Sequence, residues 1–132
     1  MSLKISLKPN EKMILAGAVI KNGSATSTFF IETPTLVLRE RDIMTEEQAV
    51  TPCKRIYFTV QLMYLDEKNM AQYHPLYWQQ VGELTDAVKT MIPLVAEINE
   101  HILTSEYYKA LKISKKMIAY EKELLDHATQ RV

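Results

Sequence analysis

Basic side chains occur at three places where the chain could hold the phosphate groups of a nucleic acid. Residues two apart in a strand share one face of a sheet, and the first turn of a helix favours anions. Proteins that read RNA combine such cations with aromatic faces on which unpaired bases stack, and Tyr57 and Tyr64 supply such rings. The candidate RNA-binding residues are therefore Lys4 and Lys8, Arg39 and Arg41, and Lys54 and Arg55.

Acidic residues stand beside two of these three basic groups. Glu40 and Asp42 flank Arg41, and Glu46 and Glu47 come shortly before the third group. Neighbouring charges of opposite sign weaken the attraction for phosphate, so an ordinary solvated surface is the alternative interpretation of these residues.

Two further groups have the composition of a protein-docking surface. Trp and Tyr are enriched at the centres of interfaces, and the pair Tyr73 and Trp78 fits this role, whereas we expect the neighbouring Tyr77 to pack in the core. A lysine ridge on a predicted amphipathic helix is the second group, and keeping that helix soluble is its alternative role. This ridge consists of Lys109, Lys112 and Lys116.

Enzyme motifs are absent from the sequence, which contains no GxSxG, P-loop, GxGxxG or HExxH. The three histidines, His74, His101 and His127, fall in separate predicted elements, and the lone Cys53 excludes a multi-cysteine zinc site. Cys53 lies near a helix start beside Lys54, where a lowered pKa would be chemically reasonable, but we interpret it as a small structural residue. We therefore expect no catalysis, no metal and no cofactor.

Length and charge narrow the class of protein. The 132 residues suit one domain, and 47% hydrophobic with 24% charged residues is typical of a folded globular chain. Sixteen basic and sixteen acidic residues give zero net charge, so a nucleic-acid site must be a local patch. The opening MSLKISLKPNEK lacks the apolar core of a signal or a membrane span, and one cysteine fits a reducing compartment, so we expect a cytoplasmic protein without membrane contact.

Residues 1–44 have the patterns of β-structure. Leu3, Ile5 and Leu7 alternate with polar residues, as in a strand with one buried face. The run Met13 to Ile20 is apolar throughout, which predicts a single strand covered on both faces. Because Asn22-Gly23 has the composition of a type I′ turn, we predict a hairpin between this strand and Ser27 to Ile31, followed by another strand at Thr35 to Arg39.

Residues 45–132 have helical patterns. Thr45 and Gln48 have the spacing of a capping box, and Thr51-Pro52 is a second start signal, for a helix running to about Leu65. Apolar spacing of three and four predicts a further helix from about Tyr77 to Met91, with Pro75 near its start. Pro93 then begins another helix, and Thr104-Ser105 precedes a longer last one. The prediction is an α+β domain over 1–132, with a small antiparallel β-sheet or hairpins packed on a bundle of four to five helices.

Six blocks of the chain resemble the FlbT family, the regulators of bacterial flagellin synthesis, in the order the family has them. They are SLKPNEK at 6–12, GAVIKNG at 17–23, VLRERDIM at 37–44, TPCKRIYF at 51–58, MYLD at 63–66 and EYYKALK at 106–112. Where FlbT chains commonly read LKPGE, this one has Asn10, which tolerates the left-handed turn conformation nearly as well as glycine.

This resemblance implies a post-transcriptional regulator of flagellum assembly that associates with the 5′ untranslated region of flagellin mRNA, as a repressor in some bacteria and an activator in others. It also implies a small helical partner, FlaF. For the RNA contact we predict that Arg39, Arg41, Lys54 and Arg55 lie close together where the sheet meets the first helix. The alternative is a protein-binding module that acts through FlaF, flagellin or the export apparatus, and self-association is compatible with either.

Overall fold

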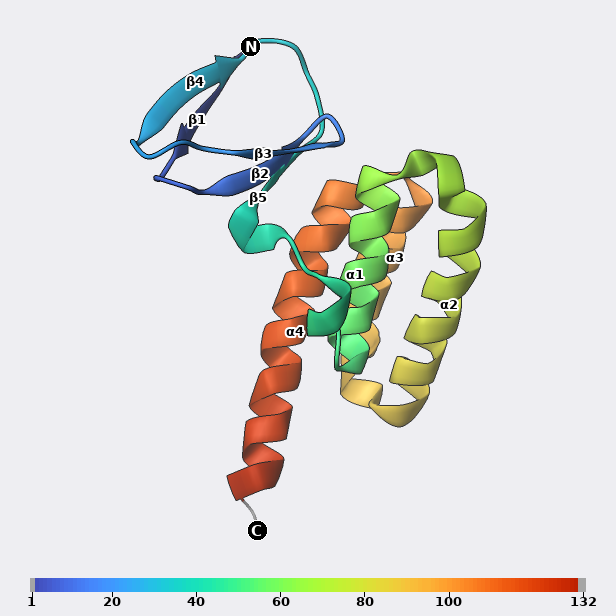
Figure 1. Cartoon of the computed structure of the whole chain (residues 1–132). Helices are drawn as coiled ribbons and strands as arrows, with labels where there is room; N and C mark the ends of the chain where they lie inside the picture. The colour runs from blue at the N-terminus through green and yellow to red at the C-terminus, as the bar shows by residue number, and fades with distance from the viewer. Residues whose placement is uncertain (1, 131–132) are drawn as a thin grey trace. The chain divides into compact units, whose positions relative to one another are not determined.

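The computed structural model describes residues 2–130 and confirms the α+β class, with antiparallel strands first and helices after them (Figure 1). The chain divides into two compact units, one ending at Ile43 and the other starting at Met44. Over the described residues, no helix combines the length and the apolar character needed to cross a membrane.

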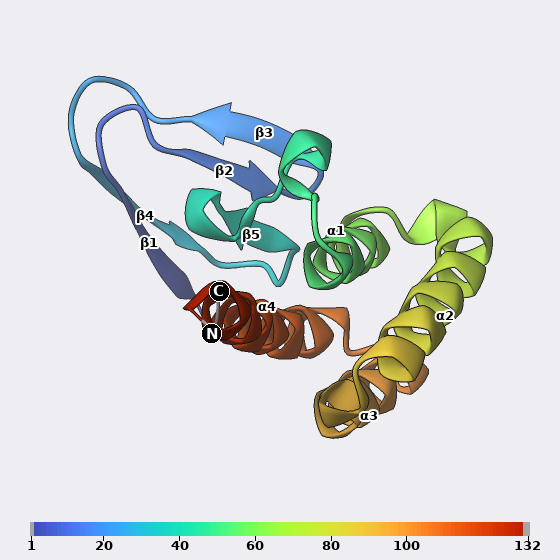
Figure 2. The same cartoon turned by 90° about the horizontal axis from the view of Figure 1, so that it is seen from below.

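The first unit contains two antiparallel ladders, which can be followed in Figure 2. One ladder has two strands and the other has three, in the order β3-β2-β5. The two-stranded ladder pairs β1 with β4. The strands are β1 Leu3–Leu7, β2 Lys12–Leu15, β3 Ala18–Lys21, β4 Ser27–Ile31 and β5 Val37–Arg39. Their core is a cluster of three buried side chains, Ile5, Leu7 and Met13.

The apolar run after Pro9 folds into a hairpin, so the prediction of a single strand from Met13 to Ile20 is wrong. Leu15 pairs with Ala18, and the two residues between them, Ala16 and Gly17, have φ of 51° and 86°. A type I′ turn requires positive φ at both central positions, which Gly17 adopts freely and Ala16 only with strain. The tight turn therefore falls inside the run and divides it into β2 and β3.

The predicted hairpin around Asn22-Gly23 does not form. The Asn22 side chain instead joins two loops of the first unit by hydrogen bonds. β4 pairs with β1 at the other end of the sequence, with Leu3 opposite Ile31. The Asn22 side-chain amide contacts the carbonyl oxygens of Leu7, Lys8 and Ala25 at 3.1, 2.8 and 3.0 Å. The side chain thus donates hydrogen bonds to loop carbonyls, and this role of asparagine competes with its placement in a type I′ turn.

The second unit is built from four α-helices within the described residues, and short 3₁₀ turns join the first helix to the second and the second to the third. Helix α1 packs against α4 and α2, and α3 packs against α4. The helices are α1 Pro52–Leu65, α2 Met70–Ala87, α3 Ile92–Leu103 and α4 Tyr107–Gln130. The predicted start of α1 at Pro52 is confirmed, with Thr51 as its N-cap and its side chain accepting the Lys54 N–H.

Helix α2 begins at Met70, about two turns before Tyr77, where the sequence predicts it to start. Pro75 lies inside it, where its missing N–H removes one helical hydrogen bond. The Asp66 carboxylate accepts hydrogen bonds from the Asn69 side chain at 2.7 Å and from the Tyr73 hydroxyl at 2.6 Å. This clamp fixes the first turn of α2 from Met70 on, so the helix start is set before the proline is reached.

The core of the helical unit lies along the inner faces of all four helices. Tyr77 is fully buried there, as predicted, and its hydroxyl donates to the Asn99 side chain at 2.6 Å. This bond satisfies a polar atom that burial would otherwise leave without water. The other large side chains that are fully or almost fully buried in this unit include Ile56, Val60, Met63, Met91, Ile98, Ile102, Leu111 and Met117.

Candidate nucleic-acid interface and helical groove

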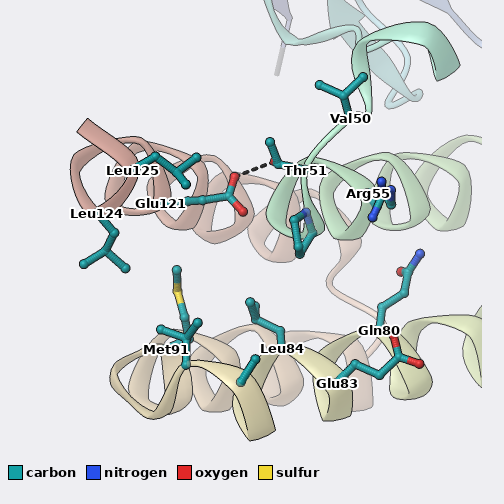
Figure 3. Close-up of a pocket in the computed structure, with 13 residues that line it drawn as sticks. Val50, Thr51, Arg55, Gln80, Glu83, Leu84, Met91, Glu121, Leu124 and Leu125 are labelled. Atoms are coloured by element: carbon teal, nitrogen blue, oxygen red, sulfur yellow. Dashed lines mark hydrogen bonds between the residues drawn. The ribbon is translucent and has the colours of Figure 1, made fainter. Parts of the chain in front are cut away.

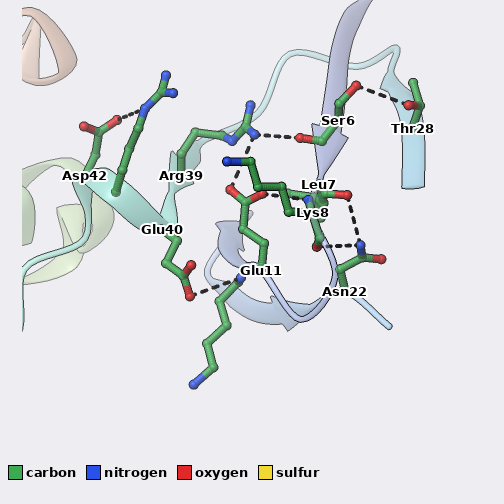
Figure 4. A network of polar contacts seen from close by, with 11 residues as sticks. Ser6, Leu7, Lys8, Glu11, Asn22, Thr28, Arg39, Glu40 and Asp42 are labelled. Carbon is green, nitrogen blue, oxygen red and sulfur yellow. Dashed lines mark hydrogen bonds and ion pairs between the residues drawn. The ribbon is translucent and has the colours of Figure 1, made fainter. Parts of the chain in front are cut away.

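Arg39 belongs to a polar network that ties the first unit together (Figure 4). Its Nη2 donates to the Ser6 carbonyl at 2.7 Å and lies 3.5 Å from the Glu11 carboxylate. The Glu11 carboxylate also accepts the Lys8 backbone N–H at 2.9 Å. That hydrogen bond, and then the charge of Arg39, hold the pKa of Glu11 below its usual value. Arg39 therefore joins β5 to β1, and its charge is compensated inside the fold.

The outer face of the β1–β4 ladder is polar except for one aromatic ring. Directly opposite residues in an antiparallel pair share a face, and here Lys4 faces Phe30 while Ser6 faces Thr28. The two hydroxyl oxygens lie 3.2 Å apart. All four residues are exposed, and Phe30 keeps 59% of its surface open. We define this set, Lys4, Ser6, Thr28 and Phe30, as the outer β-face.

Sequence reasoning missed Phe30 as a candidate site residue, although the signal was present. Phe29 and Phe30 are consecutive in a strand, so only one of the two rings can point to the core. Phe29 is the half-buried one and packs against the core cluster. The other ring must then face solvent, beside the lysine that sequence reasoning did select.

The remaining basic candidates of the first unit are exposed. Lys8 lies just after the end of β1, and Arg41 lies in the 3₁₀ turn Glu40–Asp42, outside the strand. Arg41 Nε is 4.0 Å from the Asp42 carboxylate, and the Arg41 side chain is 74% exposed, so this ion pair is weak.

The N-terminus of α1 already holds an anion supplied by the protein. The Glu121 carboxylate on α4 accepts the Cys53 N–H at 3.1 Å and the Thr51 hydroxyl at 2.5 Å, and Glu121 is only 8% exposed. A carboxylate at this position accepts hydrogen bonds from helical N–H groups that have no partner within the helix, and it interacts favourably with the positive end of the helix dipole. Phosphate binding by Lys54 and Arg55 would have to rely on their side chains alone.

Cys53 is a structural residue of this helix start. Its side chain is fully buried, and burial, followed by the nearby Glu121 carboxylate, raises the pKa of the thiol. A buried neutral thiol is a poor nucleophile. The histidines lie on α2, α3 and α4, and no group of residues in the described part of the chain could hold a metal ion.

Of the four basic residues expected at one seam, two fall in each unit. Arg39 and Arg41 belong to the first unit, and Lys54 and Arg55 belong to the second. Their proximity stays a prediction. The aromatic rings proposed for base stacking are less suitable than expected, because Tyr57 is buried and Tyr64 packs against Tyr108 at 5.6 Å between ring centroids.

The candidate partner-binding residues are spread over the helical unit. Trp78 is 38% exposed and meets Tyr77 edge to face at 5.1 Å, while the Tyr73 hydroxyl is engaged by Asp66. The lysine ridge is exposed on α4. Lys109 pairs with Glu106 at 2.7 Å, and the Lys112 ammonium lies 5.0 Å from the centre of the Tyr108 ring.

The helical unit has a groove of about 400 Å³ between α2 on one side and the start of α1 with the C-terminal part of α4 on the other (Figure 3). One end is apolar, with Leu84, Met91 and Leu124 facing the opening. The other end carries the polar side chains of Arg55, Gln80 and Glu83. Val50, Leu125 and Val88 also line the groove. The sequence did not predict it, because its walls come from segments far apart in the chain.

Comparison with known proteins decides the family. The family model described as flagellar protein FlbT matches residues 3–125. The chain belongs to the FlbT family. This confirms the resemblance seen in the six sequence blocks.

Several curated relatives of the chain are FlbT proteins of other bacteria. The flagellum biosynthesis repressor protein FlbT of Caulobacter vibrioides is 40% identical, and the match covers 100% of this chain and 95% of that protein. The probable repressor FlbT 1 of Bradyrhizobium diazoefficiens is 41% identical over 94% of this chain and 85% of its own length. The probable repressor FlbT of Rhodopseudomonas palustris is 40% identical over 95% of this chain and 98% of its own length. No solved structure matches the chain.

Proposed function

We propose that this FlbT chain regulates flagellum biosynthesis after transcription, in the cytoplasm, by binding the 5′ untranslated region of flagellin mRNA and altering its stability and translation. The regulatory part of this proposal is supported by the relatives, which are named flagellum biosynthesis repressors. The RNA contact is supported by one observation in particular, the exposed Phe30 ring beside Lys4 on the outer β-face.

Single-stranded RNA is recognised by stacking of its bases on aromatic rings while nearby cations neutralise phosphates. Phe30 offers the ring and Lys4 the cation, and the Ser6 and Thr28 hydroxyls beside them are hydrogen-bonding groups. Lys8 and Arg41 are further exposed cations of the same unit. Arg39 supports this surface from within the fold, because it holds the Ser6 carbonyl.

The test is the affinity of the purified protein for flagellin 5′ untranslated RNA at two salt concentrations. Direct phosphate contacts require affinity to fall steeply as salt rises. We expect Phe30→Ala to weaken binding by about 5- to 150-fold, the range for loss of one stacked base. Lys4→Ala should weaken it and reduce the salt slope by about 0.7, the contribution of one phosphate contact in a single strand.

A matched control is Lys21→Ala, which removes an exposed lysine from the other ladder. Arg39→Glu is a poor control, because it would break the bonds to Ser6 and Glu11 and disturb the fold. Absence of RNA binding, or equal affinity of the Phe30→Ala and Lys21→Ala variants, would remove the outer β-face from the proposal.

The second candidate function is a protein-binding accessory module that acts through FlaF, flagellin or the export apparatus without touching RNA. It is favoured by the exposed apolar residues Val50 and Leu125, which line one groove of the helical unit, since such residues gathered in one area mark protein contacts. Co-elution with purified FlaF or flagellin, together with absent RNA binding, would select this alternative. We propose no enzymatic activity in either case.

A further inference from the structure

We propose that two copies of this chain associate through the groove of the helical unit, each placing the apolar end of its α4 in the groove of the other. The proposal stands independently of RNA binding, because it rests on residues of the second unit alone.

The first observation is that the apolar stripe of α4 continues beyond the part that the bundle covers. Burial of α4 residues ends at Glu121, yet the helical spacing of three and four continues through Leu124 and Leu125. Leu124 is half-buried and Leu125 is 54% exposed. Figure 1 shows these last turns of α4 extending past the ends of α1 and α3. With 24 residues against 14 and 12, α4 is about 15 Å longer than α1 and about 18 Å longer than α3 at a rise of 1.5 Å per residue.

The second observation is that this extension faces other apolar side chains across the groove. The opposite wall consists of Leu84 and Met91, which are buried, and of the half-buried Val88, while Val50, with 63% of its surface exposed, lies at the rim. Exposed apolar residues gathered around one concavity are typical of an interaction surface. The volume of about 400 Å³ leaves room for several side chains rather than for a whole domain.

The charges around the groove are complementary to those of a second copy of the chain. Its polar end carries Arg55 and Glu83, one charge of each sign. The end of α4 also carries both signs, on the exposed Lys122, Glu123 and Asp126. A two-fold axis brings the same patch of both copies together, so each acid can meet a base of the other copy. Zero net charge means that two copies do not repel one another as wholes.

The experiment is sedimentation of the full chain from low to high micromolar concentration, with two variants on different walls of the groove. We expect a reversible dimer, and Leu125→Glu and Val50→Glu should each raise its dissociation constant by about tenfold or more, as loss of an interface anchor does. The matched control is Leu103→Glu, which adds the same charge at a residue that is 73% exposed and does not line the groove.

Far-ultraviolet circular dichroism of each variant shows whether the helices are retained. We expect all three variants to keep their helices, because the substituted side chains are exposed. A chain that stays monomeric at every concentration would overturn the proposal, and the groove would then be open to a small apolar ligand or a helix of another protein. A dimer that is unaffected by both groove variants would also overturn it, because the copies would then meet elsewhere.

Discussion

Glu121 links α4 to the start of α1 through hydrogen bonds with Thr51 and Cys53. Its removal is the sharpest test of what stabilises the helical unit. Its carboxylate accepts the Cys53 N–H and the Thr51 hydroxyl across a sequence separation of about 70 residues. Hydrogen bonds to a charged group contribute roughly 1.5–3 kcal/mol each. In Glu121→Ala the Thr51 hydroxyl can turn to water, but the Cys53 N–H stays buried without an acceptor.

We therefore expect Glu121→Ala to lower the free energy of unfolding by about 3 kcal/mol, one full charged bond and part of the second. Urea unfolding followed by the helical circular dichroism signal measures this loss, as a lower midpoint with an unchanged slope. Glu121→Gln should lose about half as much, because its neutral amide oxygen still accepts a hydrogen bond but lacks the charge.

The matched control is Glu123→Ala, the same change at an exposed position of the same helix, which should stay within about 0.5 kcal/mol of the parent protein. Because both variants carry the same change in helix propensity, their difference isolates the capping bonds. If the Glu121→Ala and Glu123→Ala midpoints coincide, the carboxylate does not hold the start of α1 and the reasoning fails.

Three further predictions concern single groups. The pKa of Glu106 is lowered to about 2 by the hydrogen bond from Lys109, then by those from its other partners, so the stability contributed by the ionised carboxylate is present above the ordinary glutamate pKa and is lost as pH falls toward 2. Nuclear magnetic resonance titration of Glu106 should show this low pKa, and the Lys109→Met variant should show a higher one. Tyr77→Phe should cost about 1–2 kcal/mol in urea unfolding because the Asn99 oxygen loses its buried donor, and an unchanged midpoint would contradict the bond. The Cys53 thiol should resist iodoacetamide in the folded protein and react once urea unfolds it, because burial raises its pKa; rapid labelling without denaturant would disprove its burial.

Helix starts were largely predictable because their chemistry is local. The N-cap of Thr51 and the proline after it act within one turn, and the Thr45–Gln48 capping box forms as expected, although it closes only a short 3₁₀ turn. The left-handed conformation expected of Asn10 is also confirmed, with φ of 63°. Pro75 did not mark the helix start as its composition suggested, because the hydrogen bonds of Asp66 to Asn69 and Tyr73 fix the start of α2 before the proline.

Strand pairing was not predictable from the same patterns. The composition of Asn22-Gly23 favours a tight turn more strongly than that of Ala16-Gly17, but only the second pair closes a hairpin. The outcome depends on β4 finding β1, which the sequence pattern between them does not specify. Among the candidate site residues, the exposure of Lys4 and Lys8 followed from alternation, whereas the bond of Arg39 to Ser6 depended on two strands meeting.

The sequence by itself determined the order of strand and helix segments, the caps of α1 and the amphipathic faces, because each rests on residues within a few positions of one another. Only the tertiary structure decided that Glu121 fills the anion position of α1, that Phe30 stands exposed beside Lys4, and that α2 and α4 leave a groove between them. The physical reason is that these arrangements depend on which distant segments fold against each other, and one chain's local pattern is compatible with several such pairings.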